Sequence, residues 1–340
     1  MCADCLICNN RKATQTNSHI IPSFLVAMVS SYDGSYKRGK ELIFTISSFQ
    51  EKTYTGALPD TKLEEIFDTD NLTDERIKNE LSDNTVAKDY IFCPVCERNL
   101  SRYLETPYAE SLFRDKKIDY DIPVFFWISV IWRMSSCSNF YGFKLPDEIN
   151  DKLHDNLKQY LQMKEEGQDI SLLLRDINFQ YKILQCKDFC KSNAGYIYCQ
   201  YNERDNILVM SMGDLCVCGM FGVDTIPEDF VFFGLESFIK DAPINSGNDH
   251  EKRHNVEPDD YKKSIQEFVK VGAKLRLNDE FQILDKMWEL SGFGRYMPIR
   301  MKMLFLQMLY DERVKIGERH TMQRYIDIFT FLRKKVYLWY

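Results

Sequence analysis

Two Cys-x-x-Cys pairs, Cys5/Cys8 and Cys93/Cys96, are the residues of this chain whose types and spacing point most clearly to chemistry. Zinc prefers thiolate ligands in tetrahedral geometry, and each such pair places two sulfurs on one tight turn. The two pairs together therefore predict a structural zinc site with four thiolates. Cys2 offers a second register, Cys2/Cys5, which ranks lower because Cys8 leads directly into a further motif.

Four other cysteines carry a different signal. Cys186/Cys190 and Cys216/Cys218 lie in or beside predicted strands and have apolar neighbours. Free cysteines are common core residues in proteins. We therefore expect these four thiols to pack in the core.

A short segment and one acidic residue beside the zinc pairs suggest hydrolytic chemistry. Ser18-His19-Ile20-Ile21-Pro22 follows the first pair, and Glu97 follows Cys96 directly. These motifs resemble the HNH, or ββα-metal, endonucleases, which are built on a zinc-bound treble clef. The resemblance covers about the first 115 residues. It is closest to uncharacterised bacterial HNH-like proteins with Ser-His-Ile-Ile-Pro, Cys-x-x-Cys-Glu and a later Trp-Arg pair, here Trp132-Arg133.

The resemblance implies a metal-dependent endonuclease that hydrolyses phosphodiester bonds in DNA or RNA. His19 would be the general base that activates water, and Glu97 would bind the catalytic Mg²⁺ or Mn²⁺ where the family carries a His. A carboxylate suits that role because hard cations accept oxygen ligands readily. Ser18 stands where many members carry an Asp or His ligand, and a serine hydroxyl is a poor metal ligand.

Two further carboxylates are candidates to help Glu97 hold that ion. Asp89 lies upstream of the second pair, out of register with the Asn of the family motif. Glu105 lies roughly on the same face as Glu97 if the helix runs unbroken. The alternative for Glu105 is an ion pair with Arg98 or Arg102 on a solvated surface, and we favour it.

The remaining histidines give weaker signals. His154 lies on a charged amphipathic segment and is expected to face solvent. His250 and His254, together with Asp249, imitate a metal cluster. The polar residues around them predict a flexible loop instead.

The formal charge of −7 argues against a nucleic-acid binder that works by bulk attraction, so we expect any contact with nucleic acid to be local. The alternative function is a catalytically inactive treble clef, in which zinc organises a surface for a nucleic-acid or protein partner. The large helical remainder supports this alternative, because a minimal nuclease does not need it. The resemblance also implies bacterial anti-phage defence with a protein partner such as an ATPase encoded in the same operon. Whether the protein is an enzyme stays open.

Eleven cysteines without a secretory leader predict a reducing cytoplasm. The longest apolar run, residues 122–132, is too short to span a bilayer. We therefore expect a buried helix there and no membrane segment.

The patterns along the chain predict an α+β protein. Residues 1–118 would form the zinc-bound treble clef, with an insertion at about residues 40–88. Residues 119–244 would combine helices with a small antiparallel sheet, residues 245–260 would be a linker, and residues 261–340 would be helical. Expected helices are 20–30, 97–113 (interrupted by Pro107), 123–134, 146–163, 261–274, 280–290, 297–312 and 321–337. Expected strands in the central region are 181–184, 195–201, 206–211, 215–221 and 230–233.

Overall fold

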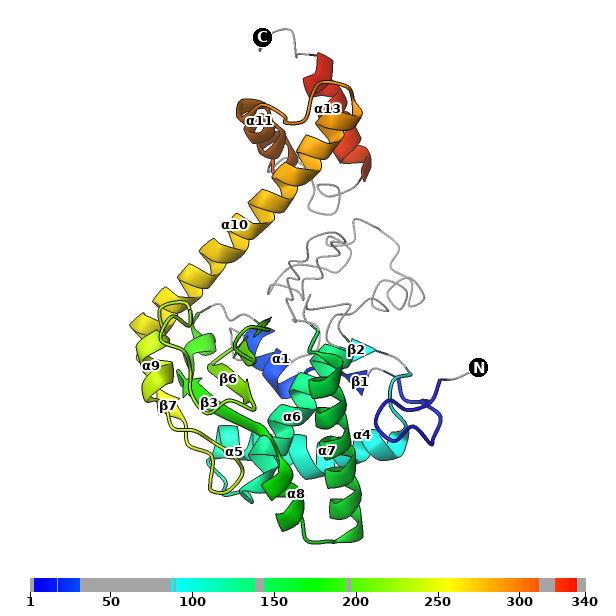
Figure 1. The fold of residues 1–340 in the computed structure, drawn as a ribbon, viewed down its shortest axis with the longest axis vertical. Coiled ribbons are helices and arrows are strands. Elements are labelled where there is room, and N and C mark those ends of the chain that lie inside the picture. Colours follow the sequence, from blue (N-terminus) through cyan, green and yellow to red (C-terminus); the bar gives the residue numbers. More distant parts are fainter. Residues whose placement is uncertain are drawn as a thin grey trace.

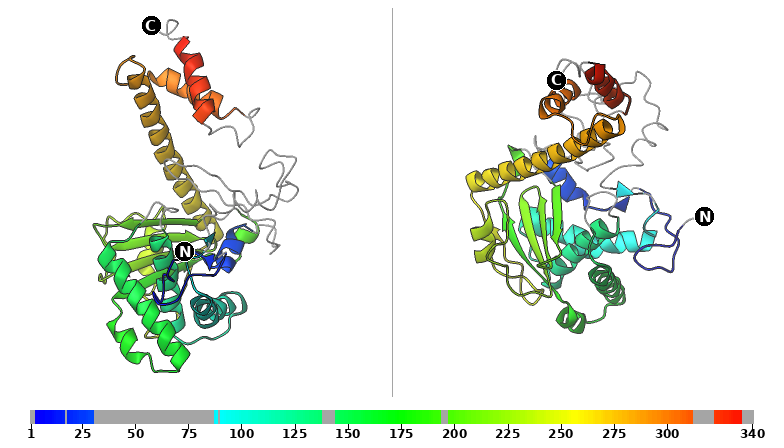
Figure 2. Two further views of the ribbon diagram at one scale, coloured as in Figure 1. Left: turned by 90° about the vertical axis from the view of Figure 1, so that its right-hand side faces the viewer. Right: turned by 45° about the horizontal axis from the view of Figure 1, so that its top comes forward.

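A five-stranded sheet lies between two layers that cover its faces (Figure 1 and Figure 2). The architecture comes from a computed structural model, which describes residues 3–16, 18–30, 87–88, 90–137, 144–193, 197–311 and 322–334. The strand order is β4-β5-β6-β3-β7. The strands are β3 (Phe179–Gln185), β4 (Ile197–Asn202), β5 (Ile207–Met212), β6 (Leu215–Phe221) and β7 (His254–Asn255). All neighbours are antiparallel except the short β7, which is parallel to β3, so the protein is mixed α+β as predicted.

Both faces of the sheet are buried, which explains why its strands read as nearly continuous hydrophobic runs. On β5, Leu208 and Met210 belong to one core, whereas Ile207 and Val209 belong to the other. This alternation follows from the pleat, because successive side chains of a strand point to opposite faces.

The first layer is helical and is built around one apolar helix. In α6 (Asp121–Ser136), every residue from Asp121 to Ser135 is buried, as expected of a helix that is apolar on all sides. Other helices contribute to the same core. They are α1 (Ser23–Ser30), α4 (Pro94–Leu100), α5 (Thr106–Arg114), α7 (Asp147–Glu166) and α8 (Ser171–Asp176).

A π-helical turn, Ser101–Glu105, joins α4 to α5. Pro107 has no N–H group, so it cannot continue the α-helical hydrogen bonding at this point. The backbone N–H of Thr106 donates to the carbonyl of Ser101, which is the wider spacing of a π-helix. The predicted interruption at Pro107 is therefore a local widening of a helix that continues beyond it.

The second layer comprises α9 (Glu236–Asp241), the loop before it and the first turns of α10 (Pro258–Leu290). The predicted strand at residues 230–233 is wrong, because this segment is a loop without a partner strand. Phe230 and Phe232 are nevertheless buried in the core of this layer. Phe233 has φ 51°, a left-handed conformation that an extended strand does not contain.

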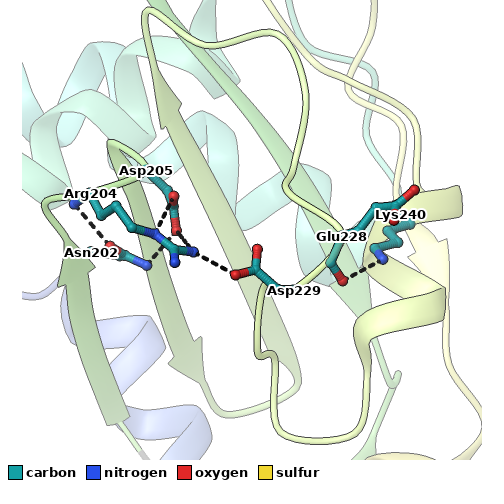
Figure 3. A network of polar contacts seen from close by, with 6 residues as sticks. All are labelled: Asn202, Arg204, Asp205, Glu228, Asp229 and Lys240. Carbon is teal, nitrogen blue, oxygen red and sulfur yellow. Dashed lines mark hydrogen bonds and ion pairs between the residues drawn. The ribbon is translucent and has the colours of Figure 1, made fainter.

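Ion pairs on the surface connect this layer to the sheet (Figure 3). Arg204, in the turn between β4 and β5, donates to Asp205 at 2.9 Å and to Asp229 at 3.1 Å. Lys240 donates to the carbonyl of Glu228 at 3.0 Å. Because the charged groups of Arg204 and Asp229 are solvated, these pairs fix the loop more than they stabilise the fold.

The segment predicted to be a linker, residues 245–260, is bonded to the sheet. Asn245 exchanges both backbone hydrogen bonds with Tyr181, at 3.0 and 2.8 Å. The side chain of Glu251 is 4% exposed. Its carboxylate accepts hydrogen bonds from Tyr108, Trp127, Tyr181 and Arg253. The expectation of a flexible loop around His250 and His254 is therefore wrong, because the segment supplies β7 and a buried carboxylate.

The C-terminal helices form a core of their own. α10 (Pro258–Leu290) is one continuous helix, so the predicted break between residues 274 and 280 is absent. Its last turns pack with α11 (Ile299–Leu309) and α13 (Met322–Lys334) around Trp288 and Phe305. In Figure 1, α10 extends away from the sheet and carries this helical group at its far end. None of the described helices is long and apolar enough to cross a membrane.

The N-terminal part completes the fold with two short strands. β1 (Ser18–His19) pairs antiparallel with β2 (Ala87–Lys88). The predicted insertion at residues 40–88 lies outside the described residues except for β2 itself. The proposed division of the chain into domains stays a prediction.

Candidate metal centre

The first cysteine pair lies in a short hairpin. The N–H of Cys5 donates to the carbonyl of Arg11 at 2.8 Å, and the N–H of Ala13 donates to that of Ala3 at 2.9 Å. Asn9 closes the turn with φ 56°, a left-handed conformation that asparagine tolerates better than most residues. The turn places Cys5 and Cys8 on the same side of the hairpin, as a two-sulfur ligand pair requires.

The second pair begins a helix. Cys93 is the N-cap of α4, Pro94 occupies the first turn, and Cys96 lies one turn from the cap. The N–H of Cys96 points to the sulfur of Cys93 at 3.5 Å. The amino end of a helix favours negative charge, so this position stabilises thiolates.

Backbone hydrogen bonds bring the two pairs together across the long intervening segment. The N–H of Leu6 donates to the carbonyl of Ile91 at 2.9 Å, and Gln15 bonds Phe92 and Tyr90 at 3.1 and 2.8 Å. These bonds hold the hairpin beside the residues that precede Cys93. The two cysteine pairs therefore lie side by side, although a long segment separates them in the sequence.

The four sulfurs converge. The ligand atoms of Cys5, Cys8, Cys93 and Cys96 all lie within 4.8 Å of one another. A tetrahedral ion with metal–sulfur bonds of about 2.3 Å requires sulfur separations of about 3.8 Å. The Cys8 and Cys93 sulfurs are 4.0 Å apart, which suits such an ion and is far too long for a disulfide. The group can hold a metal ion and is consistent with zinc.

The electrostatics of the cluster favour negative charge. The Cys96 thiol donates to the Cys5 sulfur, and backbone N–H groups also point at that sulfur. These bonds lower the pKa of Cys5, against the opposing effect of burial. The pKa of Cys96 is raised because its proton is held by Cys5. The sulfur of Cys93 raises the pKa of the neighbouring Arg11, which is the cation at the edge of the cluster.

His19 is held in place through its backbone carbonyl. It lies on β1, half-buried, and its carbonyl accepts from the guanidinium of Arg133 at 2.8 Å. The cysteines are the only group of three or more His, Cys, Asp or Glu side chains in the described part of the chain whose ligand atoms converge. In that part of the chain, neither His19 nor Glu97 therefore belongs to a converging group of three or more such side chains.

Glu97 lies one residue beyond Cys96 in the first turn of α4. Burial raises the pKa of its carboxyl, and the nearby Ser18 hydroxyl and Arg133 lower it in part. Ser18 Oγ and Glu97 Oε2 are both shielded from solvent, and within strict hydrogen-bonding geometry neither has a partner among the described residues; the Ser18 hydroxyl is nevertheless close enough to Glu97 for hydrogen bonding to lower the pKa of that carboxyl. Buried polar atoms without a well-formed hydrogen bond are rare, and such an atom on a carboxylate is a candidate for binding a water or an ion.

Glu105 is engaged elsewhere. Its carboxylate lies 2.8 Å from the guanidinium of Arg133, whose side chain is 2% exposed. Arg98 and Arg102 are exposed. The expected surface pair of Glu105 with either of them is therefore wrong, and Glu105 serves the buried arginine. Cys2 and Asp89 lie outside the described residues.

The four cysteines of the sheet region behave as predicted. All are buried, and they belong to the core on the second face of the sheet. Burial raises the pKa of Cys186 to about 11 and that of Cys218 to about 12, so these thiols stay protonated. Core packing is confirmed for them.

The position of His154 differs from the prediction. It was expected to face solvent, but its side chain is 16% exposed and its Nε2 lies 2.9 Å from the carbonyl of Ile7, between the first two cysteines. The pattern of α7 could not show this contact, because it joins residues 147 positions apart.

Comparison of the chain with known protein families, curated proteins and solved structures finds no match.

Proposed function

We propose that the N-terminal part of the chain is a treble clef whose four cysteines bind a structural zinc ion. The support is local geometry: a hairpin supplies one sulfur pair, and the first turn of α4 supplies the other. An all-thiolate set of this spacing is the usual ligand set of structural zinc. Zinc binding would then fix α4, and with it Glu97, relative to β1.

We further propose that this centre supports an HNH-like endonuclease. The observation that carries the proposal is the buried Glu97 Oε2, which follows the cysteine pair in the first turn of α4 and has no partner within strict hydrogen-bonding geometry, although the nearby Ser18 hydroxyl lowers the pKa of this carboxyl. A hard divalent ion would satisfy Glu97, and Mg²⁺ is commonly held by one or two carboxylates together with water and substrate phosphate. Since Arg133 engages Glu105, Glu97 would be the main protein ligand, and the substrate would complete the shell.

The chain's own residues would divide the remaining work. His19 would accept the proton of the attacking water as general base. Arg133 would hold the His19 peptide and Glu105 in place, since it bonds both at 2.8 Å. The exposed Arg98, on α4, and Arg102, in the π-helical turn that follows, would contact the phosphate backbone locally. A bound divalent ion would supply charge neutralisation at the scissile phosphate.

The alternative is a catalytically inactive treble clef that presents a binding surface. One observation favours it: no third carboxylate or imidazole joins Glu97 and His19 in a converging group among the described residues. Zinc would then be structural only, and Ser18 and Glu97 would enclose an ordered water. Under this alternative the protein binds nucleic acid or a partner protein without cleaving a phosphodiester bond.

Cleavage assays separate the two functions. Supercoiled plasmid, single-stranded DNA and RNA would be incubated with the protein and Mg²⁺ or Mn²⁺, comparing wild type with His19→Ala and Glu97→Gln. Glu110→Gln is the matched control, because Glu110 pairs with Lys116 at the protein surface. Nuclease function predicts cleavage by wild type and Glu110→Gln, and a loss of at least about 100-fold in the other two. A zinc-loaded wild-type protein that binds these substrates without cutting them would establish the alternative.

A further inference from the structure

Helix α7 contacts the cysteine module through one imidazole. The Nε2 atom of His154 lies 2.9 Å from the carbonyl oxygen of Ile7. A carbonyl oxygen can only accept a hydrogen bond, so Nε2 must carry the proton and donate it. Ile7 is 1% exposed and lies in the turn between Cys5 and Cys8. The donated bond therefore fixes the peptide that sets the relative positions of the first two sulfurs.

The same imidazole is held in place by an aromatic stack. The rings of His154 and Trp132 stack with centroids 5.1 Å apart and an interplanar angle of 25°. Trp132 also stacks with Phe92, at 6.5 Å and 30°. Phe92 is fully buried and directly precedes Cys93. The stack thus begins at the second cysteine pair and ends at the hydrogen bond to the first.

This arrangement spans three elements far apart in the sequence. Phe92 comes from the bend before α4, Trp132 from the end of α6 and His154 from α7. A second bond, from Asn99 of α4 to Glu165 of α7 at 3.0 Å, holds the two helices together. The rigid helical layer therefore supports the cysteine module from one side.

We infer that His154 is a positioning residue for the metal site, which holds the Cys5/Cys8 turn in ligand geometry from α7. Groups outside the ligand shell that orient metal ligands commonly change metal affinity by 10- to 100-fold when they are removed. The inference rests on the zinc-binding part of the proposed function and is independent of nuclease activity. Its ligand is the metal ion itself, so zinc affinity is the direct readout.

Three substitutions separate the hydrogen bond from the packing. His154→Phe keeps an aromatic ring against Trp132 but removes the donor to Ile7. His154→Gln retains an amide donor at about the position of Nε2. Tyr160→Phe is the matched control on the same helix, because it removes the bond from Tyr160 to Asp121 at 2.9 Å without touching the cysteine module.

The experiment measures zinc affinity by competition with a chromophoric chelator at neutral pH under reducing conditions, with circular dichroism to confirm folding. We expect the zinc dissociation constant to rise 10- to 100-fold in His154→Phe and to stay within about 3-fold of wild type in His154→Gln and Tyr160→Phe. An unchanged constant in His154→Phe would overturn the inference. So would an equal rise in Tyr160→Phe, because the effect would then be general loss of stability.

Two further outcomes are distinguishable. If the wild-type protein binds no zinc, the proposed structural site itself fails, whatever the variants show. If His154→Phe does not fold, His154→Asn replaces it, because its shorter amide reaches less far toward Ile7 than that of Gln. Weaker zinc binding in His154→Asn than in His154→Gln would support the inference, and equal binding in both would contradict it.

Discussion

Two groups of four cysteines can be compared: Cys5, Cys8, Cys93 and Cys96 of the candidate metal centre, and Cys186, Cys190, Cys216 and Cys218 of the second core. All are buried except the half-buried Cys8, yet their surroundings differ. The N-terminal sulfurs converge within 4.8 Å, and the pKa of Cys5 is lowered by hydrogen bonds to its sulfur. The sheet thiols lie among apolar side chains, and burial raises their pKa. The comparison teaches that convergence and donated hydrogen bonds, rather than burial, distinguish a metal site from a core.

The largest expected effect removes one sulfur from the first group. Cys96→Ser should abolish stoichiometric zinc binding, because a neutral hydroxyl replaces a thiolate ligand at the helix terminus. Structural zinc contributes about 10–16 kcal/mol of apparent binding free energy in zinc-finger peptides, so the module should unfold with the loss. Metal analysis of the purified protein measures this. Cys218→Ser is the control, and it should keep its zinc; equal zinc content in the two variants would erase the distinction between the groups.

The second-largest effect on stability is expected in the sheet region, where the buried carboxylate of Glu251 holds several polar side chains. Glu251→Ala should lower the free energy of unfolding by about 3–5 kcal/mol, because it leaves Arg253 and the two tyrosines without their buried partner. Urea unfolding followed by circular dichroism gives the value, with zinc affinity expected to stay at the wild-type level. Asp249→Asn, on the exposed side of the same loop, should change stability little. A Glu251→Ala protein as stable as wild type would show that this network is dispensable.

A smaller effect appears at alkaline pH. Burial, reinforced by the charge of Glu251, raises the pKa of Tyr181 well above its ordinary value of 10.0. Above about pH 10 the unfolded chain loses this proton while the folded protein keeps it, so the folded state binds more protons and stability falls as pH rises. Tyr181→Phe should cost about 1–2 kcal/mol at pH 8 and should lose stability less steeply above pH 10. Urea unfolding at pH 8 and above pH 10 gives the free energy of unfolding of both proteins. An equal loss of this free energy between the two pH values in wild type and Tyr181→Phe would contradict the assignment.

The smallest effect on stability is expected at Ser18. Its buried hydroxyl makes no hydrogen bond of strict geometry and acts only on the neighbouring Glu97, so Ser18→Ala should change the free energy of unfolding by less than about 1 kcal/mol. A loss of more than about 1 kcal/mol would show that the hydroxyl makes a strong hydrogen bond in the folded protein, to Glu97, a water or an ion. Urea unfolding with and without Mg²⁺ distinguishes these cases.

The sequence revealed local features and missed contacts between distant residues. The spacing of Cys5/Cys8 and Cys93/Cys96 was sufficient to predict the cluster, and the apolar run at residues 122–132 predicted a buried helix. Arg133 and Glu251 could not be found in this way. Their partners lie 114 and 143 positions away, and a charge that is buried by such partners looks the same in sequence as a solvated one.

Local patterns also misled where packing decided the outcome. The run at residues 230–233 has the apolar composition of a strand, but its phenylalanines fill the second core from a loop, and Phe233 turns the chain. Residues 274–280 look like a break between helices, yet α10 continues through them because helix formers surround the few weak positions. A pattern therefore identifies burial more reliably than it identifies the element that is buried.

X-ray absorption at the zinc edge of the purified protein tests the central claim most directly. The account predicts about one zinc ion per chain with four sulfur ligands at about 2.3 Å and no nitrogen or oxygen in the first shell. A protein without zinc, or an ion with fewer than four sulfurs, would contradict the assignment of Cys5, Cys8, Cys93 and Cys96 as its ligands.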